Sequence, residues 1–198
     1  MEDGDPERHS DDQQQHVLGV ESHEMSLPKL KLHILTAVTR PWNVSTIAAS
    51  IFDQHHIGWE IYWHLTHENE EFVGGQVLKN RMLDQIPEED DSWVYILDDD
   101  TVMHSDFQRY TYDAIQDHPR CVGMVFAQLR PEGVIQPELR SGVIDVGQVL
   151  LRREQIADIR IPDFYDGDGW WLTAVLSDSD VVWSNDVLST YNALRKES

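Results

Sequence analysis

An alternation of strand and helix patterns in the first half of the chain is the strongest constraint on its fold. Apolar runs at residues 30–38, 59–66 and 93–97 predict strands, and residues 44–54 and 75–86 between them predict amphipathic helices. Strands that alternate with helices are typical of a parallel sheet joined by right-handed crossovers. We therefore predict an α/β fold with a mainly parallel central sheet flanked by helices.

The second half of the chain shows the same kinds of element at less regular spacing. The predicted elements are a helix at 105–117, a strand at 121–128, a surface loop at 129–142, a strand at 143–151, a short helix at 152–157 and a helix at 169–176.

The third predicted strand, Trp93 to Leu97, ends abruptly in three carboxylates, Asp98, Asp99 and Asp100. The carboxyl ends of strands are where open α/β sheets bind ligands. Adjacent carboxylates repel one another, and a hard cation such as Mg²⁺ or Mn²⁺ relieves that repulsion. The pattern favours a metal-assisted phosphate site over the alternative of a solvated acidic turn or helix cap.

Composition limits the partners and the number of domains. With 15 Lys and Arg against 36 Asp and Glu, the net charge is −21, which disfavours nucleic acid and anionic membrane surfaces as partners. A phosphorylated small molecule remains compatible, because a divalent ion and local cations supply positive charge within a site. The 198 residues suit one domain, predicted at 27–198, preceded by a disordered acidic tail at 1–26 that contains eight acids.

The sequence also carries expectations about compartment. It shows no signal peptide and no apolar stretch long enough to span a bilayer, so we expect a cytoplasmic protein, or a domain of a longer one. Cys121 is the only cysteine, which excludes an internal disulfide.

Several motifs, in order, resemble those of nucleotide-sugar-dependent glycosyltransferases of the GT-A fold, and the glucuronosyltransferase-like branch in particular. The motifs are the strand Leu32–Val38 followed by Thr39-Arg40-Pro41, the helix Gly75–Leu83, the Asp-X-Asp signature at Asp98–Asp100, the segment Gly142–Leu150, and Asp166-Gly167-Asp168-Gly169-Trp170-Trp171-Leu172. In the second motif Lys79 stands where the family usually has arginine, and in the last Gly167-Asp168 replaces the more usual Glu-Asp pair.

The resemblance implies a role for each matching residue. It implies that Asp100 contacts Mn²⁺ or Mg²⁺, that Asp98 contacts the metal, its water or the ribose, and that Asp99 supports both. The other implied donor contacts are Thr36, Val38, Thr39 and Arg40 around the nucleoside, Lys79, Asn80 and Arg81 near the diphosphate, and Asp145 on sugar hydroxyls.

For the acceptor, the resemblance implies that Asp168 is the catalytic base, with Asp166 as second candidate. An ordinary helix N-cap is the simpler interpretation of either residue. Trp170 or Trp171 is a candidate surface for sugar stacking, and we expect one of the two to be buried. The implied function is metal-dependent transfer of a sugar from a nucleoside diphosphate, UDP being favoured, to an acceptor hydroxyl of a carbohydrate or glycan, with the stereochemical outcome left open.

Two alternatives remain at this point. Asp98-Asp99-Asp100-Thr101-Val102 also fits the nucleophile motif of haloacid-dehalogenase-like phosphatases, with Asp98 as the nucleophile. That design needs a later lysine ahead of an acidic pair, whereas the only lysine after Lys79 is Lys196, behind Asp178 and Asp180. The second alternative is a catalytically silent module that binds a nucleotide sugar.

Overall fold

A computed structural model describes residues 29–54, 58–67 and 75–195. Its strands are β1 (Leu30–Val38), β2 (Trp59–His67), β3 (Ser92–Ile96), β4 (Val102–Met103), β5 (Gly123–Arg130), β6 (Gly133–Ile135), β7 (Val149–Arg152) and β8 (Val181–Thr190). Its helices are α1 (Val44–Phe52), α2 (Gln76–Leu83), α3 (Phe107–Asp117), α4 (Arg153–Ile156) and α5 (Gly167–Leu176), with 3₁₀ turns η1 (Pro41–Asn43) and η2 (Val146–Gln148). The prediction for residues 1–26 falls outside the described residues.

The strands of the described part form one sheet in the order β2-β1-β3-β7-β5-β8-β4, with β6 paired to β5. The three longest pairings, β1 with β2, β5 with β8 and β1 with β3, are parallel. Strand β7 lies antiparallel between β3 and β5, so β1, β2, β3, β5 and β8 all point the same way. The mainly parallel sheet is confirmed, and the carboxyl ends of its major strands meet at one edge.

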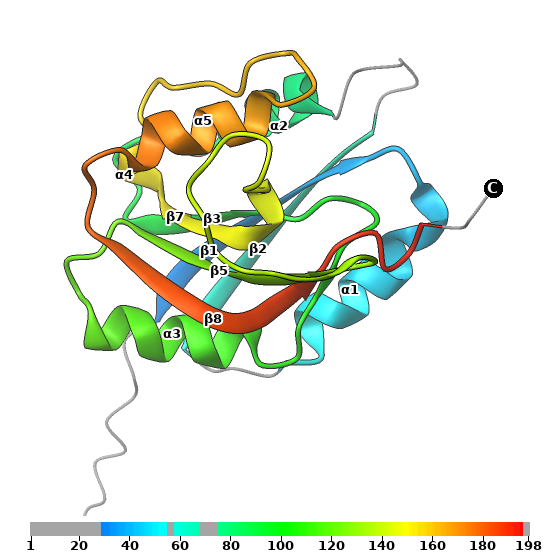
Figure 1. Cartoon of the computed structure of the whole chain (residues 1–198), viewed down its shortest axis with the longest axis horizontal. Coiled ribbons are helices and arrows are strands. Elements are labelled where there is room, and N and C mark those ends of the chain that lie inside the picture. Colours follow the sequence, from blue (N-terminus) through cyan, green and yellow to red (C-terminus); the bar gives the residue numbers. More distant parts are fainter. Residues whose placement is uncertain (1–28, 55–57, 68–74, 196–198) are drawn as a thin grey trace, which may run out of the picture.

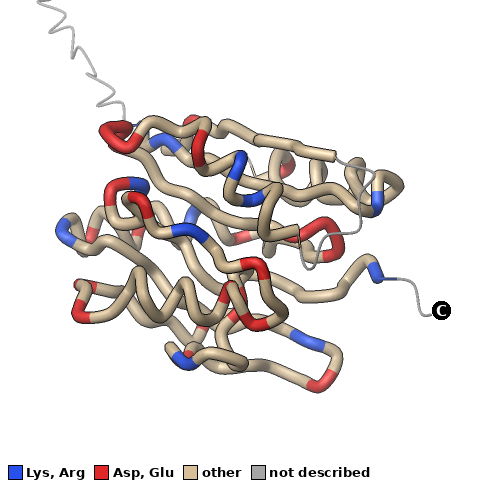
Figure 2. The backbone as a smooth tube through the Cα atoms, turned by 90° about the horizontal axis from the view of Figure 1, so that it is seen from above, with Lys and Arg blue, Asp and Glu red and all other residues tan. Residues whose placement is uncertain are grey.

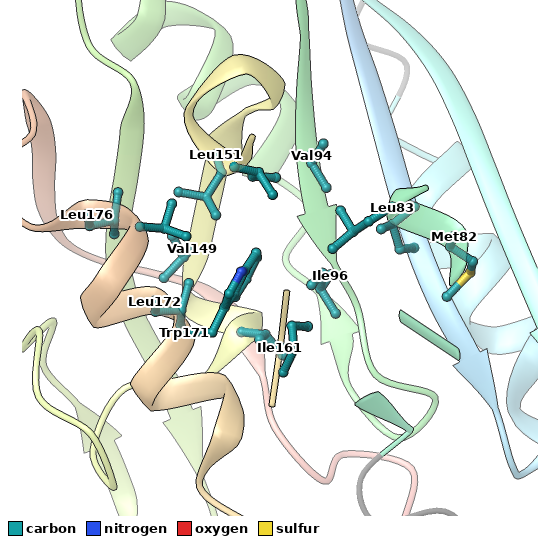
Figure 3. Packing of buried hydrophobic residues seen from close by; sticks show 14 of the residues in the cluster. Met82, Leu83, Val94, Ile96, Val149, Leu151, Ile161, Trp171, Leu172 and Leu176 are labelled. Carbon is teal, nitrogen blue, oxygen red and sulfur yellow. The ribbon is translucent and has the colours of Figure 1, made fainter. Parts of the chain in front are cut away.

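Helices cover both faces of the sheet, with α2, α4 and α5 on one side and α1 and α3 on the other (Figure 1). Each face buries its own apolar cluster. On the first face, Trp171 of α5 packs among residues of β3 and β7 (Figure 3). On the other face, the rings of Tyr95, Phe107 and Phe126 contact one another, with centroids 4.6–6.1 Å apart. The loops at the carboxyl edge are thus held by packed elements on both sides.

Two predicted elements are wrong in detail. The segment 143–151 is not a continuous strand, because the Asp145 side chain caps η2 by accepting from Gly147 N at 2.8 Å, and the strand begins only at Val149. The predicted surface loop 129–142 contains β6, which folds back on β5 as a hairpin. The prediction also lacked β4 and β8, although β8 is a parallel partner of β5 along most of that strand.

The acidic residues of the described part are spread over many loops, with Lys and Arg interspersed (Figure 2).

No helix among the described residues is long and apolar enough to cross a bilayer.

Candidate active site

Two adjoining cavities open at the carboxyl edge, beyond the ends of β1 and β3. The Arg40 cavity, of about 270 Å³, is lined by Ala37, Thr39, Arg40, Gly75, Asp98, Asp99, Asp100, Tyr191 and Arg195. The Lys79 cavity, of about 250 Å³, is lined by Gln76, Lys79, Asp98, Arg130, residues 142–145, Tyr165, Asp166, Asp168 and Tyr191. Asp98 and Tyr191 border both cavities, so the two form one cleft with the first aspartate of the triplet at its centre.

The Asp99 side chain is hydrogen-bonded to the loop that follows β1. Its carboxylate accepts hydrogen bonds from Thr39 N at 2.5 Å, Thr39 Oγ1 at 2.9 Å, Arg40 N at 2.5 Å and Arg40 Nη1 at 2.5 Å. The Asn43 side chain also donates to the Asp99 carbonyl at 2.8 Å. These bonds fix the Thr39-Arg40 loop as one wall of the Arg40 cavity.

Asp100 lines the same cavity, but its negative charge is balanced less closely by Arg40 than that of Asp99 is. Its Oδ2 is 3.4 Å from Arg40 Nη1, and its side chain is almost fully buried. Burial, together with the charge of Asp98, raises the pKa of Asp100, whereas Arg40 lowers it. The Asp100 carboxylate therefore faces the cavity with part of its charge uncompensated.

Lys79 is the buried cation of the second cavity. Only 2% of the residue is exposed, and its Nζ lies 2.7 Å from Asp98 Oδ1. Burial opposes the charge on Lys79, but Asp98, Asp168 and Asp145 outweigh that effect and raise its pKa. Lys79 stays protonated and carries the positive charge around which these three acids gather.

The two other acids near Lys79 have raised pKa values. Burial, followed by the charges of Asp98 and Asp168, raises the pKa of Asp145 to about 6. Burial also raises the pKa of Asp168, against the opposing effects of Lys79 and of the hydrogen bond from Gly169 N. Carboxyl groups with raised pKa values in a cleft are characteristic of catalytic acids and bases.

The start of α5 is shaped to present Asp168. A Cβ atom on Gly167 would lie 2.1 Å from the Pro162 carbonyl oxygen, and one on Gly169 would lie 3.1 Å from Ser141 Cα. Glycine on both sides therefore lets the backbone approach these neighbours, with Asp168 between them on the cavity wall. Asp166 borders the same cavity but is exposed and makes no side-chain cap bond to the helix.

The helix also separates its two tryptophans. Trp171 is buried and donates from Nε1 to the Ile159 carbonyl at 3.1 Å, whereas Trp170 is 51% exposed. The prediction that one of them is buried is confirmed.

Four residues with an implied donor contact lie outside the lining of both cavities. Thr36 is fully buried and accepts from Trp63 Nε1 at 3.0 Å, and Val38 is part of the core. Asn80 exchanges two hydrogen bonds with the backbone of Ile161, at 2.8 and 2.9 Å. Arg81 lies on the exposed side of α2.

The structure adds cavity residues that the sequence analysis did not select, namely Gln76, Arg130, Tyr165, Tyr191 and Arg195. Tyr191 and Arg195 follow β8, so they were missed together with that strand. The apolar run Val181 to Trp183 was the available signal for it. The Arg130 guanidinium lies 5.2 Å from the centre of the Tyr191 ring and holds it at the junction of the cavities.

The acids of the Arg40 cavity fit a divalent cation shared with a ligand. Within the described ranges, no three His, Cys, Asp or Glu side chains converge into a complete metal site. Mg²⁺ and similar ions, however, commonly use one or two carboxylates together with substrate phosphates. Asp98 and Asp100 both border this cavity, and the incompletely compensated charge of Asp100 suits such a role.

No protein-family model matches the chain, and no curated protein matches it in sequence. Solved structures do. S. aureus TarS matches with a TM-score of 0.60 and 13% identity over 82% of this chain and 36% of its own. Mannosyltransferase PcManGT from Pyrobaculum calidifontis, in complex with GDP-Man and Mn²⁺, matches with a TM-score of 0.60 and 12% identity over 85% of this chain and 58% of its own.

A third match is the catalytic domain of Drosophila beta1,4-galactosyltransferase 7 in complex with xylobiose, with a TM-score of 0.56 and 13% identity over 85% of this chain and 71% of its own. The chain thus spans about a third of the first of these structures and somewhat over half of the second. Likeness at this identity is a likeness of fold, and these neighbours are glycosyltransferases. The chain therefore has the GT-A fold.

Proposed function

We propose that the protein is a metal-dependent glycosyltransferase that moves a sugar from a nucleoside-diphosphate sugar to a hydroxyl of a carbohydrate acceptor. One observation carries the proposal: the two cavities share Asp98 and together make a cleft with Arg40 and Asp100 at one end and Asp168 at the other. A donor and an acceptor that meet near Asp98 would occupy one half each. The fold shared with glycosyltransferases supports transfer over the phosphatase chemistry that the Asp triplet also allows.

The Arg40 cavity suits the nucleoside diphosphate. Arg40 and Arg195 supply positive charge for phosphate oxygens, and the backbone of the Thr39-Arg40 loop is held in place by Asp99. Asp98 and Asp100 would hold Mn²⁺ or Mg²⁺, whose chemical contribution is to stabilise the negative charge of the leaving diphosphate as a Lewis acid. That a mannosyltransferase of this fold was solved with GDP-Man and Mn²⁺ supports this class of donor and cofactor.

Asp168 is the proposed base that accepts the proton of the acceptor hydroxyl. Its Oδ1 accepts from Gly169 N at 2.8 Å, which orients the carboxylate and leaves the second oxygen for the acceptor. A pKa raised by burial makes this carboxylate a better proton acceptor than an exposed aspartate. Asp166, which is exposed, is the weaker candidate.

Aromatic side chains near the Lys79 cavity support a carbohydrate acceptor. Tyr165 lines the cavity and is 86% exposed, and Phe164 and Trp170 nearby in the sequence are each about half exposed. Aromatic faces beside a polar cavity suit the apolar face of a sugar ring, while the carboxylates accept bonds from its hydroxyls. The galactosyltransferase of this fold that was solved with xylobiose is consistent with such an acceptor.

Binding of UDP with and without Mn²⁺, measured by isothermal titration calorimetry, tests the proposal, with GDP as the second probe. The parent protein should bind one of the two more tightly with Mn²⁺, and Asp100→Ala should lose that enhancement while it stays folded. Asp113→Ala, an exposed acid on α3, is the matched control and should behave as the parent.

Equal Mn²⁺ enhancement in Asp100→Ala and the parent would show that the metal site is misplaced. If the parent binds neither nucleotide, the donor proposal is wrong. Release of sugar from the matching nucleotide sugar separates an enzyme from a silent binding module, and hydrolysis of p-nitrophenyl phosphate would favour the phosphatase alternative.

A further inference from the structure

A single buried amide stands out on the wall of the Lys79 cavity. Among the described residues, four buried side-chain atoms have no hydrogen-bond partner: Gln76 Oε1, Thr101 Oγ1, Arg152 Nε and Asn192 Oδ1. Of these four residues, only Gln76 lines a cavity of the site. The residue with the unpartnered acceptor therefore borders the space in which the donor sugar and the acceptor would meet.

An unpaired buried acceptor is costly, so its presence needs a reason. Leaving such an atom without a donor lowers the stability of the protein, and the great majority of buried polar atoms are paired. Gln76 is 3% exposed and begins α2, the helix that also carries Lys79. Because Gln76 borders a cavity, a ligand bound there would be able to supply the missing hydrogen-bond partner.

Gln108 shows what a buried glutamine looks like when its role is structural. It is also 3% exposed, but its Nε2 donates to the Ile51 carbonyl at 2.5 Å, and it lies on α3, on the opposite face of the sheet. The two residues have the same chemistry and the same burial. They differ in whether the protein itself supplies a partner.

The chemistry of the amide limits what can complete it. Glutamine offers one acceptor oxygen and two N–H donors, and a half-turn of its terminal torsion exchanges them at small cost. The neighbouring cavity groups, Lys79 and Asp98, are already paired with each other at 2.7 Å. A hydroxyl, which both donates and accepts, is the neutral group that matches this amide in either orientation.

We propose that Gln76 is a specificity-determining residue that recognises one hydroxyl of the transferred sugar. The proposal rests on the proposed function, since it places the donor sugar in the Lys79 cavity next to Asp98. Sites that hydrogen-bond a substrate hydroxyl discriminate strongly against analogues that lack it, because the protein group is then left unpaired. Gln76 thereby excludes sugars that carry no hydroxyl, or an inverted one, at the position it faces.

The test compares Gln76→Met with Gln108→Met. Titration calorimetry with UDP-glucose, UDP-galactose, GDP-mannose, UDP and GDP gives, for each protein, the ratio of the dissociation constant of the free diphosphate to that of its sugar. For the best-bound sugar, Gln76→Met should lower this ratio about tenfold or more while the Kd of the diphosphate itself is unchanged. Gln108→Met should leave both values as in the parent.

Thermal unfolding provides the second contrast. Gln76→Met removes an unpaired polar group, so its melting temperature should equal or exceed that of the parent. Gln108→Met removes a paired buried amide and should melt at a lower temperature. A variant that gains stability and loses sugar recognition cannot be explained by a structural role for Gln76.

Monodeoxy analogues of the best-bound sugar identify the hydroxyl. In the parent, one analogue should bind about tenfold more weakly, and in Gln76→Met the same analogue should bind as well as its hydroxylated counterpart. If every analogue loses equal affinity in the parent and in Gln76→Met, the inference is wrong although the proposed function stands. If the parent binds no nucleoside diphosphate, the proposed function and the inference fall together.

Discussion

Asp99 in one half of the cleft and the acids around Lys79 in the other are compensated in opposite ways. In the Arg40 cavity, Asp99 receives four hydrogen bonds from Thr39 and Arg40, so its charge is met by the protein itself. In the Lys79 cavity, Asp145 and Asp168 share Lys79 with Asp98, and their pKa values are raised. Asp99 is thus compensated within the protein, whereas the acids around Lys79 keep an electrostatic cost that catalysis or a ligand can relieve, as does Asp100 next to Asp99.

The largest loss of stability should come from removing the Asp99 carboxylate. Asp99→Ala leaves the donors of the Thr39-Arg40 loop without their acceptor, and removal of one member of a buried charged network typically costs 3–5 kcal/mol. We expect the free energy of unfolding in urea to fall by about 4 kcal/mol. Asp100→Ala, one residue away, should change it by less than about 1 kcal/mol, because the contact of Asp100 with Arg40, at 3.4 Å, is longer than that of Asp99. Equal losses in the two variants would contradict the contrast.

Removal of the Lys79 ammonium group should lower the free energy of unfolding slightly less. Lys79→Met leaves Asp98 without its partner and brings three carboxylates together, so we expect a loss of about 3 kcal/mol at pH 7. The loss should shrink towards pH 4, where the pKa values of Asp145 and Asp168, raised by burial and no longer lowered by Lys79, allow both to be protonated. Lys31→Met, at an ion pair with Asp90 in which the lysine side chain is 44% exposed, is the control and should change the stability much less than Lys79→Met at either pH. A pH-independent loss in Lys79→Met would show that packing, not charge, dominates at Lys79.

The third prediction concerns turnover. Asp168→Asn keeps the size of the side chain and its bond from Gly169 N but removes its basicity, so the rate of sugar transfer should fall about a hundredfold with nearly unchanged donor affinity. Asp166→Asn, on the exposed side of the cavity mouth, should reduce the rate much less. If the order of the two variants is reversed, their roles are exchanged. If neither is impaired, a mechanism that retains configuration without a protein base becomes the better interpretation.

Elements with a strong hydrophobic pattern could be predicted from the sequence. The strand 30–38 has the predicted bounds, and the helix 44–54 ends two residues earlier than predicted, because apolar residues at the period of each element leave little choice of face. Strand β8 was not recognised despite the apolar run at its start, since the polar run Ser184-Asn185-Asp186 interrupts its pattern where its register with β5 shifts. Irregular pairing of this kind is fixed by neighbouring strands rather than by local sequence.

Within the site, the acidic end of the strand was visible in the sequence, but the separate contacts of the three aspartates were not. The triplet forms a turn, in which Thr101 N donates to the Asp98 carbonyl at 3.0 Å, so the direction of each carboxylate depends on the turn and not on the alternation of a strand. That Gln76 lacks a partner and that Lys79 is buried depends on segments brought together by the fold. The position of Asp145 was misjudged for the same reason, because the turn that it caps looked like part of a strand.

The smallest predicted effect is the change in stability caused by the charge of the buried Asp145 carboxylate. Asp145 has its pKa raised to about 6, chiefly by burial and then by Asp98 and Asp168, so the native state binds a proton more tightly than the unfolded state does. Stability from this group is complete below the unfolded pKa near 4 and is lost as pH rises through about 6.

Asp145→Asn keeps an oxygen to accept from Gly147 N and carries no charge at any pH. In metal-free buffer, urea unfolding should give equal stability for the parent and Asp145→Asn near pH 3.5, and a variant more stable by about 1–2 kcal/mol at pH 7. The exposed control Asp113→Asn should follow the parent at both pH values. If the parent and Asp145→Asn have the same pH profile, the cluster around Lys79 is fully compensated, and the contrast between the two halves of the cleft is lost.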